Sequence, residues 1–224
     1  NFSFRMTDEE YRVLEKIKNS IPVCYLADHA DFALGIVTGN NKKFLSAEKT
    51  EHSEMVLKGT DICKYHINPA KQYLRFEPEQ FQQVAPLEIY RAPEKLLYRF
   101  ISNQLVVAYD DRQMLSLNSC NIVIPKIEGM QIKYILAILN SSVSQFVYQK
   151  EFHSIKVLRA HMEHIPIPRV GKAIQNEIIA MTEPLICGMG KEAAETCQKR
   201  LDCRIMDLFR LSAEEQWIIR HALH

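Results

Sequence analysis

A glycine turn followed directly by two lysines is the segment of this sequence best suited to hold a phosphate. Residues 38–43 read Thr-Gly-Asn-Asn-Lys-Lys, and glycine and asparagine tolerate the positive φ that a tight turn needs. Exposed backbone amides flanked by Lys42 and Lys43 favour an anion site. The segment lacks GxGxxG and the P-loop pattern, so it is not a nucleotide-cofactor loop. A plain hairpin turn is the alternative interpretation.

The chain carries no recognisable set of catalytic residues. It has no G-x-S-x-G, no HExxH, no P-loop and no acidic nuclease pattern. Residues 68–71, Asn-Pro-Ala-Lys, fail the pattern with which amino-methyltransferases grip an amine, and no glycine-rich loop for S-adenosylmethionine is present. His161 and His164 have the spacing of two metal ligands, but no third ligand is near and two prolines follow. We therefore expect no catalytic and no metal-binding residues in this chain.

Composition indicates a globular protein with nearly balanced charge. The 224 residues are 47% hydrophobic and 25% charged, with a net charge of +1, so a dominant electrostatic attraction to a polyanion is not expected. Six cysteines without CxxC spacing fit a reducing compartment, and we expect a cytoplasmic protein. No apolar run reaches the roughly 18 residues of a membrane helix. Since the chain begins at Asn1, we expect a piece of a longer protein.

These residues must be positioned by a sheet predicted at residues 91–124. Three apolar runs, at 96–101, 105–109 and 121–124, are separated by short polar clusters, which predicts an antiparallel meander. The runs are more apolar than strict alternation requires, so we expect both faces of the sheet to be covered, and by helices. The predicted fold class is α+β: a twisted, mostly antiparallel sheet with packed helices and a helical C-terminal extension.

Helical patterns flank the sheet on both sides in the sequence. Thr7 and Glu10 form a capping box before a helix that ends near Lys18. A helix is predicted at 130–140, and a second one is capped by Ser141 or Ser142. From Gly171 onward the pattern is helical, at 172–186, 190–210 and 213–222. We therefore predict an α+β domain at 1–168 and a helical extension at 169–224.

An ordered set of segments resembles one known family. The segments are 35–44 (GIVTGNNKKF), 58–65 (KGTDICKY), 93–99 (PEKLLYR), 134–142 (YILAILNSS), 165–168 (IPIP) and 201–215 (LDCRIMDLFRLSAEE). This order resembles the TaqI-like C-terminal specificity domain of adenine-N6 DNA methyltransferases and restriction–modification enzymes, and half of a type I restriction specificity subunit.

The resemblance implies a domain that recognises a duplex DNA target, while a separate catalytic domain of the same chain methylates adenine. That domain would use S-adenosylmethionine, and Mg²⁺ where the parent protein also cuts DNA.

A domain that reads bases needs polar and basic side chains on turns or strands that face a groove. We expect the two glycine turns, at 38–43 and 58–65, to contribute to one such surface. The expected DNA-contacting residues are Thr38, Asn40, Asn41, Lys42, Lys43, Lys58, Lys64, Tyr65, Lys95, Arg112, Gln113, Lys150, Lys156 and Arg159.

Two alternatives to DNA recognition remain at this point. The C-terminal helices carry the apolar stripe Leu201, Ile205, Leu208 and Phe209, which would serve a protein-interaction module that does not bind DNA. A self-contained hydrolase or nuclease is the other alternative.

Overall fold

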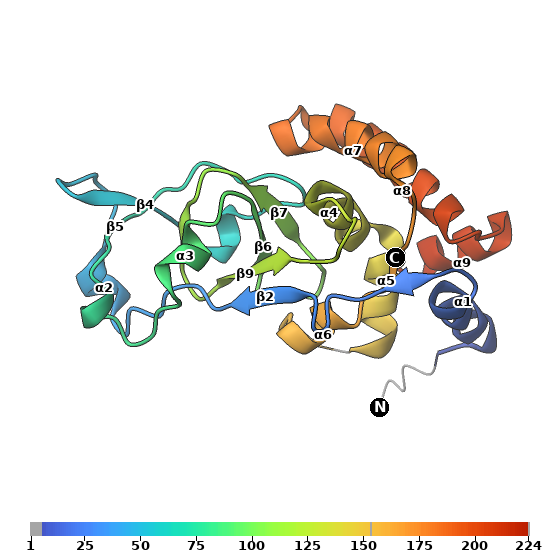
Figure 1. Ribbon diagram of the computed structural model, residues 1–224, viewed down its shortest axis with the longest axis horizontal. Coiled ribbons are helices and arrows are strands. Elements are labelled where there is room, and N and C mark those ends of the chain that lie inside the picture. Colours follow the sequence, from blue (N-terminus) through green and yellow to red (C-terminus); the bar gives the residue numbers. More distant parts are fainter. Residues whose placement is uncertain (1–5, 153, 224) are drawn as a thin grey trace.

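A four-stranded antiparallel sheet forms the centre of the computed structural model, which describes residues 6–152 and 154–223. Its strand order is β2-β9-β6-β7 (Figure 1). The strands are β2 (Ala30–Ala33), β6 (Lys95–Arg99), β7 (Val107–Asp110) and β9 (Cys120–Pro125). Strands β2 and β7 are therefore the two edges of the sheet.

The central sheet separates two hydrophobic cores, because successive side chains of a strand point to opposite faces. On β6, Leu96 and Tyr98 belong to one core and Leu97 to the other. The first core is shared with the helices, and the second with the short strands and loops of residues 36–90. Both faces are covered, as expected, the first mainly by the longer helices and the second by short strands, loops and the short helix Leu87–Tyr90.

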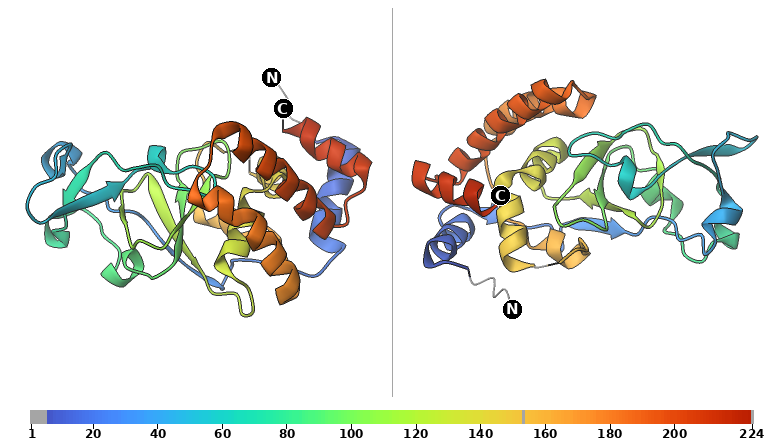
Figure 2. Two further views of the ribbon diagram at one scale, coloured as in Figure 1. Left: turned by 90° about the horizontal axis from the view of Figure 1, so that it is seen from above. Right: turned by 180° about the vertical axis from the view of Figure 1, so that it is seen from behind.

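A second, smaller sheet lies at the end of the molecule away from the C-terminal helices (Figures 1 and 2). Its order is β3-β5-β4-β8, and only the β4–β8 pair is parallel. The elements of this end are α2 (Asn41–Phe44), β3 (Leu45–Ser46), β4 (Ser53–Leu57), η1 (Gly59–Asp61), β5 (Tyr73–Arg75), η2 (Pro78–Gln80), α3 (Leu87–Tyr90) and β8 (Leu115–Ser116).

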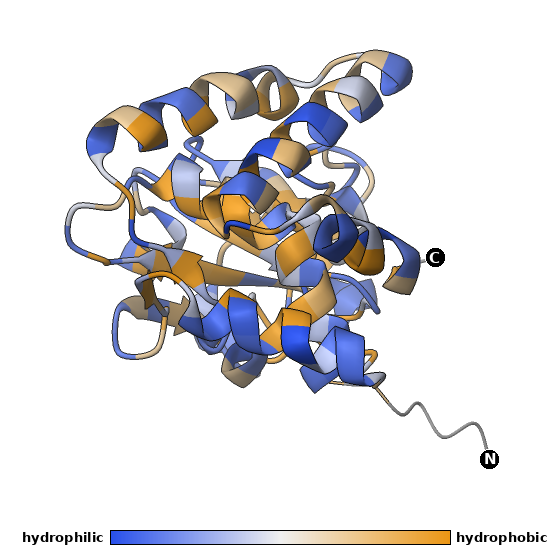
Figure 3. Cartoon of the chain, turned by 90° about the vertical axis from the view of Figure 1, so that its right-hand side faces the viewer, coloured by the Kyte–Doolittle hydropathy of each residue, from blue (hydrophilic) through white to orange (hydrophobic). Residues whose placement is uncertain are grey.

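The helices gather around the first core at the other end of the molecule. Figure 3 views this end and shows hydrophobic stretches turned inward and hydrophilic stretches on the outer helical turns. The remaining elements are α1 (Asp8–Asn19), β1 (Val23–Cys24), α4 (Ile132–Asn140), α5 (Ser142–Glu151), α6 (Arg159–Glu163), β10 (Ile167–Pro168), α7 (Lys172–Cys187), α8 (Lys191–Leu208) and α9 (Ala213–Ala222). Every helix in the described part of the chain is too short or too polar to span a bilayer.

The predicted fold class is confirmed, and so is the capping box of α1. Ser212 and Glu215 form a second capping box at the start of α9. The meander is wrong for its third strand. β6 and β7 form a hairpin, but β9 pairs with the other edge of β6. The chain leaves β7 through β8, which pairs with β4 in the smaller sheet, so a tight turn from β7 into β9 is not formed.

A loop between β8 and β9, residues 117–119, joins the two sheets. Leu117 donates its amide to Leu57, and Phe100 donates its amide to Ser119. A Cβ added to Gly35 would lie 2.1 Å from the Leu117 carbonyl oxygen, and one added to Gly59 would lie 2.6 Å from the Ser119 carbonyl oxygen. Only glycine permits these approaches. Contact with residues 117–119, the junction loop, therefore explains why glycine stands at positions 35 and 59 of the two motifs.

Candidate nucleic-acid interface

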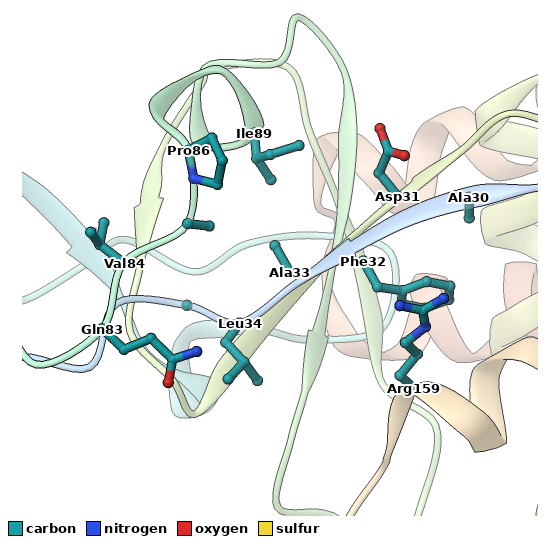
Figure 4. Close-up of a pocket in the computed structure, with 12 residues that line it drawn as sticks. Ala30, Asp31, Phe32, Ala33, Leu34, Gln83, Val84, Pro86, Ile89 and Arg159 are labelled. Carbon is teal, nitrogen blue, oxygen red and sulfur yellow. The ribbon is translucent and has the colours of Figure 1, made fainter.

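An open groove runs along edge strand β2 (Figure 4). Its volume is about 680 Å³. Residues 30–35 form one wall, residues 83–86 and Ile89 form another, and Arg159 lies beside Phe32. The acidic residue of the groove, Asp31, is paired with Lys126 at 2.5 Å, so its charge is compensated.

Arg159 presents a fixed guanidinium group to this groove. Its Nε donates to Glu163 Oε1 at 2.7 Å, and its guanidinium carbon lies 5.1 Å from the centre of the Phe32 ring. The side chain is nevertheless 61% exposed. Because one edge of the guanidinium is occupied and its face is stacked, the remaining nitrogens are oriented for a phosphate or a base.

The glycine turn at 38–43 lies next to the groove. Val37 and Gln83 exchange two backbone hydrogen bonds, at 2.9 and 3.1 Å, and so join the turn to the groove wall. The Oδ1 atom of Asn40 accepts from the Lys43 amide and caps α2, while Asn41 accepts from the buried Thr38 hydroxyl at 2.6 Å. Thr38, Asn40 and Asn41 therefore build the turn.

Lys42 and Lys43 are the exposed cations of that turn. Neither forms an ion pair with any described residue, and the Lys43 ammonium lies 4.7 Å from the centre of the Phe44 ring. Cations without an internal partner keep their charge available for a phosphate.

Lys95 and Tyr65 are inside the protein, so their assignment to a DNA contact is wrong. Lys95 is fully buried, donates to Asp110 at 2.5 Å and to the Tyr90 carbonyl at 2.7 Å, and ties β6 to β7. Burial lowers its pKa, although Asp110 opposes that shift. Tyr65 is 2% exposed, and its hydroxyl has no hydrogen-bond partner among the described residues.

Lys64 and Lys150 are also held by internal contacts. Lys64 donates to the Asn140 carbonyl at 3.1 Å, and burial lowers its pKa. Lys150 pairs with Glu10 at 2.6 Å and joins α5 to α1. These lysines connect parts of the fold, which leaves them poorly placed for a phosphate.

The two glycine turns are not brought into one surface. The second motif ends at Tyr65, which exchanges backbone hydrogen bonds with edge strand β7, whereas the first follows the opposite edge strand, β2, and joins the segment at Gln83. Of the other expected residues, Lys58 is half-buried, while Arg112, Gln113 and Lys156 are exposed. Of the expected residues, Arg159 alone lines the groove, and the first turn adjoins its wall through the Val37–Gln83 pair.

Two groove residues, Gln83 and Phe32, were not among the expected contacts. Gln83 lies in an extended segment, Phe81-Gln-Gln-Val-Ala-Pro86, that has no helical or strand periodicity. The only signal in the sequence is a pair of consecutive amide side chains before a proline. His161 of α6 and His164, which follows that helix, are engaged locally, since His161 accepts from the Leu158 amide and His164 contacts the Ala160 carbonyl.

The sequence matches the TaqI-like C-terminal specificity domain family over residues 54–167. The chain therefore belongs to this family, and the resemblance found in its motifs is confirmed. A comparison with curated proteins found no match.

Solved structures share the fold. One is a chain from work on the complex assembly and conformational transition of a type I restriction–modification system. Its TM-score is 0.51 and its sequence identity is 13%, and the match covers 96% of this chain and 51% of that chain. The Type IIL restriction–modification enzyme MmeI, solved in complex with DNA, gives a TM-score of 0.57 and 11% identity over 85% of this chain and 34% of that one. This chain thus spans about half of the first protein and a third of the second.

Proposed function

We propose that this chain binds duplex DNA as the target-recognition domain of a larger restriction–modification enzyme of the cytoplasm. Family membership is the observation that carries this proposal. The groove beside β2 supports it, because Arg159 offers exposed positive charge there, and Lys42 and Lys43 offer more on the turn that adjoins the groove wall.

In this proposal, a separate catalytic domain of the same parent chain methylates adenine N6 with S-adenosylmethionine. An Mg²⁺-dependent cleavage activity would belong to that part too. With a net charge of +1, the isolated domain should bind DNA weakly, and linkage to the catalytic part would raise its effective concentration on the duplex.

The alternative, a protein-interaction module, requires the apolar stripe of α8 to be exposed. Leu201, Ile205 and Phe209 are each fully buried in the chain's own first core. The apolar stripe that would bind a partner helix in that alternative therefore packs α8 against this chain's own first core.

Removing the two turn lysines tests the proposal. Lys42→Ala/Lys43→Ala should weaken binding to duplex DNA and should lower the slope of log K against log salt by about 2, since each phosphate contact contributes about 0.9. Fluorescence anisotropy with a labelled duplex at several salt concentrations measures both quantities.

The matched control is Lys191→Ala/Lys199→Ala, which removes two exposed lysines from α8. It should leave the affinity and the salt slope unchanged. Absence of duplex binding by the unchanged chain, or equal losses in the two double variants, would count against the proposal.

A further inference from the structure

The side-chain amides near the groove divide into engaged and unengaged groups. The carbonyl oxygens of Asn40 and Asn41 accept hydrogen bonds inside the turn, and Gln80 donates to Glu77 at 2.6 Å. Within residues 6–152 and 154–223, no hydrogen bond engages the side chain of Gln82 or Gln83. Both glutamines are exposed. Each retains the adjacent donor and acceptor that pair with two atoms of one base edge.

Gln83 alone of these two lines the groove (Figure 4). Its backbone is fixed in both directions by the pair of hydrogen bonds with Val37. Gln82 packs instead against the turn, with its Cβ 3.3 Å from the position of a Cβ added to Gly39. Gln83 thus combines a fixed backbone with an amide that is free to bind a base edge in the groove.

Arg159 supplies the second fixed group of the groove. Its exposed guanidinium can contact the DNA backbone and so define the register in which Gln83 meets a base edge. Glutamine matches adenine, because its amide can accept from N6 and donate to N7 in the major groove.

We propose that Gln83 is a specificity-determining residue that reads one adenine of the DNA target. This inference rests on the proposed function. It predicts that one position of the target prefers adenine through Gln83, while Lys42, Lys43 and Arg159 contribute affinity without sequence preference.

The experiment is selection of duplexes from a randomised pool by the chain, followed by affinity measurement on the enriched sequence and its single-base variants. Gln83→Ala should lose the preference for adenine at one position, by about 5- to 150-fold, and should keep the preferences elsewhere. Gln82→Ala, the neighbouring control, should keep the whole target.

Gln83→Glu separates base recognition from folding. A carboxylate only accepts hydrogen bonds, so the preference at that position should change from adenine to cytosine, whose N4 donates. A changed preference cannot arise from unfolding. If Gln83→Ala and Gln83→Glu leave every preference unchanged while the unchanged chain selects a target, the inference is overturned and the proposed function stands. If the unchanged chain enriches no sequence, both are overturned.

Discussion

Whether a charged side chain of this fold lies in the interior or faces the groove depends on where its counter-charge lies. Lys95 is directly opposite Asp110 in the β6–β7 register, and both side chains have 0% exposure. Asp110 also accepts from the amides of Arg112 and Met114 and so closes the turn after β7. The sequence did not predict this pairing, because the pairing depends on the hairpin register. The predicted runs left a connection of three residues, 102–104, whereas β6 ends at Arg99 and β7 begins at Val107.

Replacing Lys95 should therefore cost stability and leave base preference intact. Lys95→Met leaves Asp110 buried without its counter-charge, so the free energy of unfolding should fall by about 3–5 kcal/mol. Urea denaturation followed by circular dichroism measures this change. Lys42→Ala, at an exposed and unpaired lysine, should change it by less than about 0.5 kcal/mol. Equal effects of the two substitutions would contradict the assignment.

At the scale of elements, local signals predicted the longer helices but missed the short helices α2 and α3 and the order of the strands. Helices α7, α8 and α9 begin and end within about two residues of their predicted bounds, because the helical periodicity lies within each segment and the glycines or Ser212 that precede them mark their starts. The pairing of β9 with β6 joins segments separated by a crossing into the smaller sheet, and no short pattern encodes that. The groove has the same origin, since it combines β2, residues 83–86 and α6.

The junction loop offers a direct test of how these elements meet. Gly35→Ala would place a methyl group 2.1 Å from the Leu117 carbonyl oxygen, so the free energy of unfolding should fall by about 1–3 kcal/mol or more. Gly171→Ala is the steric control, because nothing lies within 4 Å of its added Cβ and its φ is −67°. Since Gly171 is the N-cap of α7, where alanine is less favourable than glycine, this variant should lose about 1 kcal/mol or less. Thermal unfolding should show a larger fall in Tm for Gly35→Ala, and an equal fall for both would contradict the steric argument.

At the scale of the molecule, the helical tail is attached to the sheet domain through a polar contact as well as through the core. Asp202 of α8 accepts from the Ser142 amide at 2.8 Å, at the first residue of α5, and also contacts the Ser142 hydroxyl. This contact holds α8 against the start of α5. Burial raises the pKa of the Asp202 carboxyl above its ordinary value, although Ser142 and Lys64 oppose the shift.

This raised pKa predicts a pH dependence of stability. As the pH falls from about 7 to about 4, folded Asp202 takes up a proton before unfolded Asp202 does, so its contribution becomes more favourable. Asp202→Asn cannot take up that proton. The free energy of unfolding of the unchanged chain, minus that of the variant, should therefore rise as the pH falls. Urea titrations at several pH values measure this difference, and Glu195→Gln, at an exposed position of α8, should show none. A constant difference for Asp202→Asn would refute the prediction.

The tight seating of Gly35 and Gly59 on residues 117–119 has a consequence for retargeting such a domain. Three strand-connecting segments meet there with no room for one additional methyl group, so they must be exchanged together or left alone. The tips beyond that contact, at 38–43 and 80–86, pack on each other instead, with a Cβ added to Gly39 lying 3.3 Å from the Gln82 Cβ, so they form one exchangeable unit. A graft of those tips alone, with the glycines and their loop kept, is the exchange that the scaffold should accept.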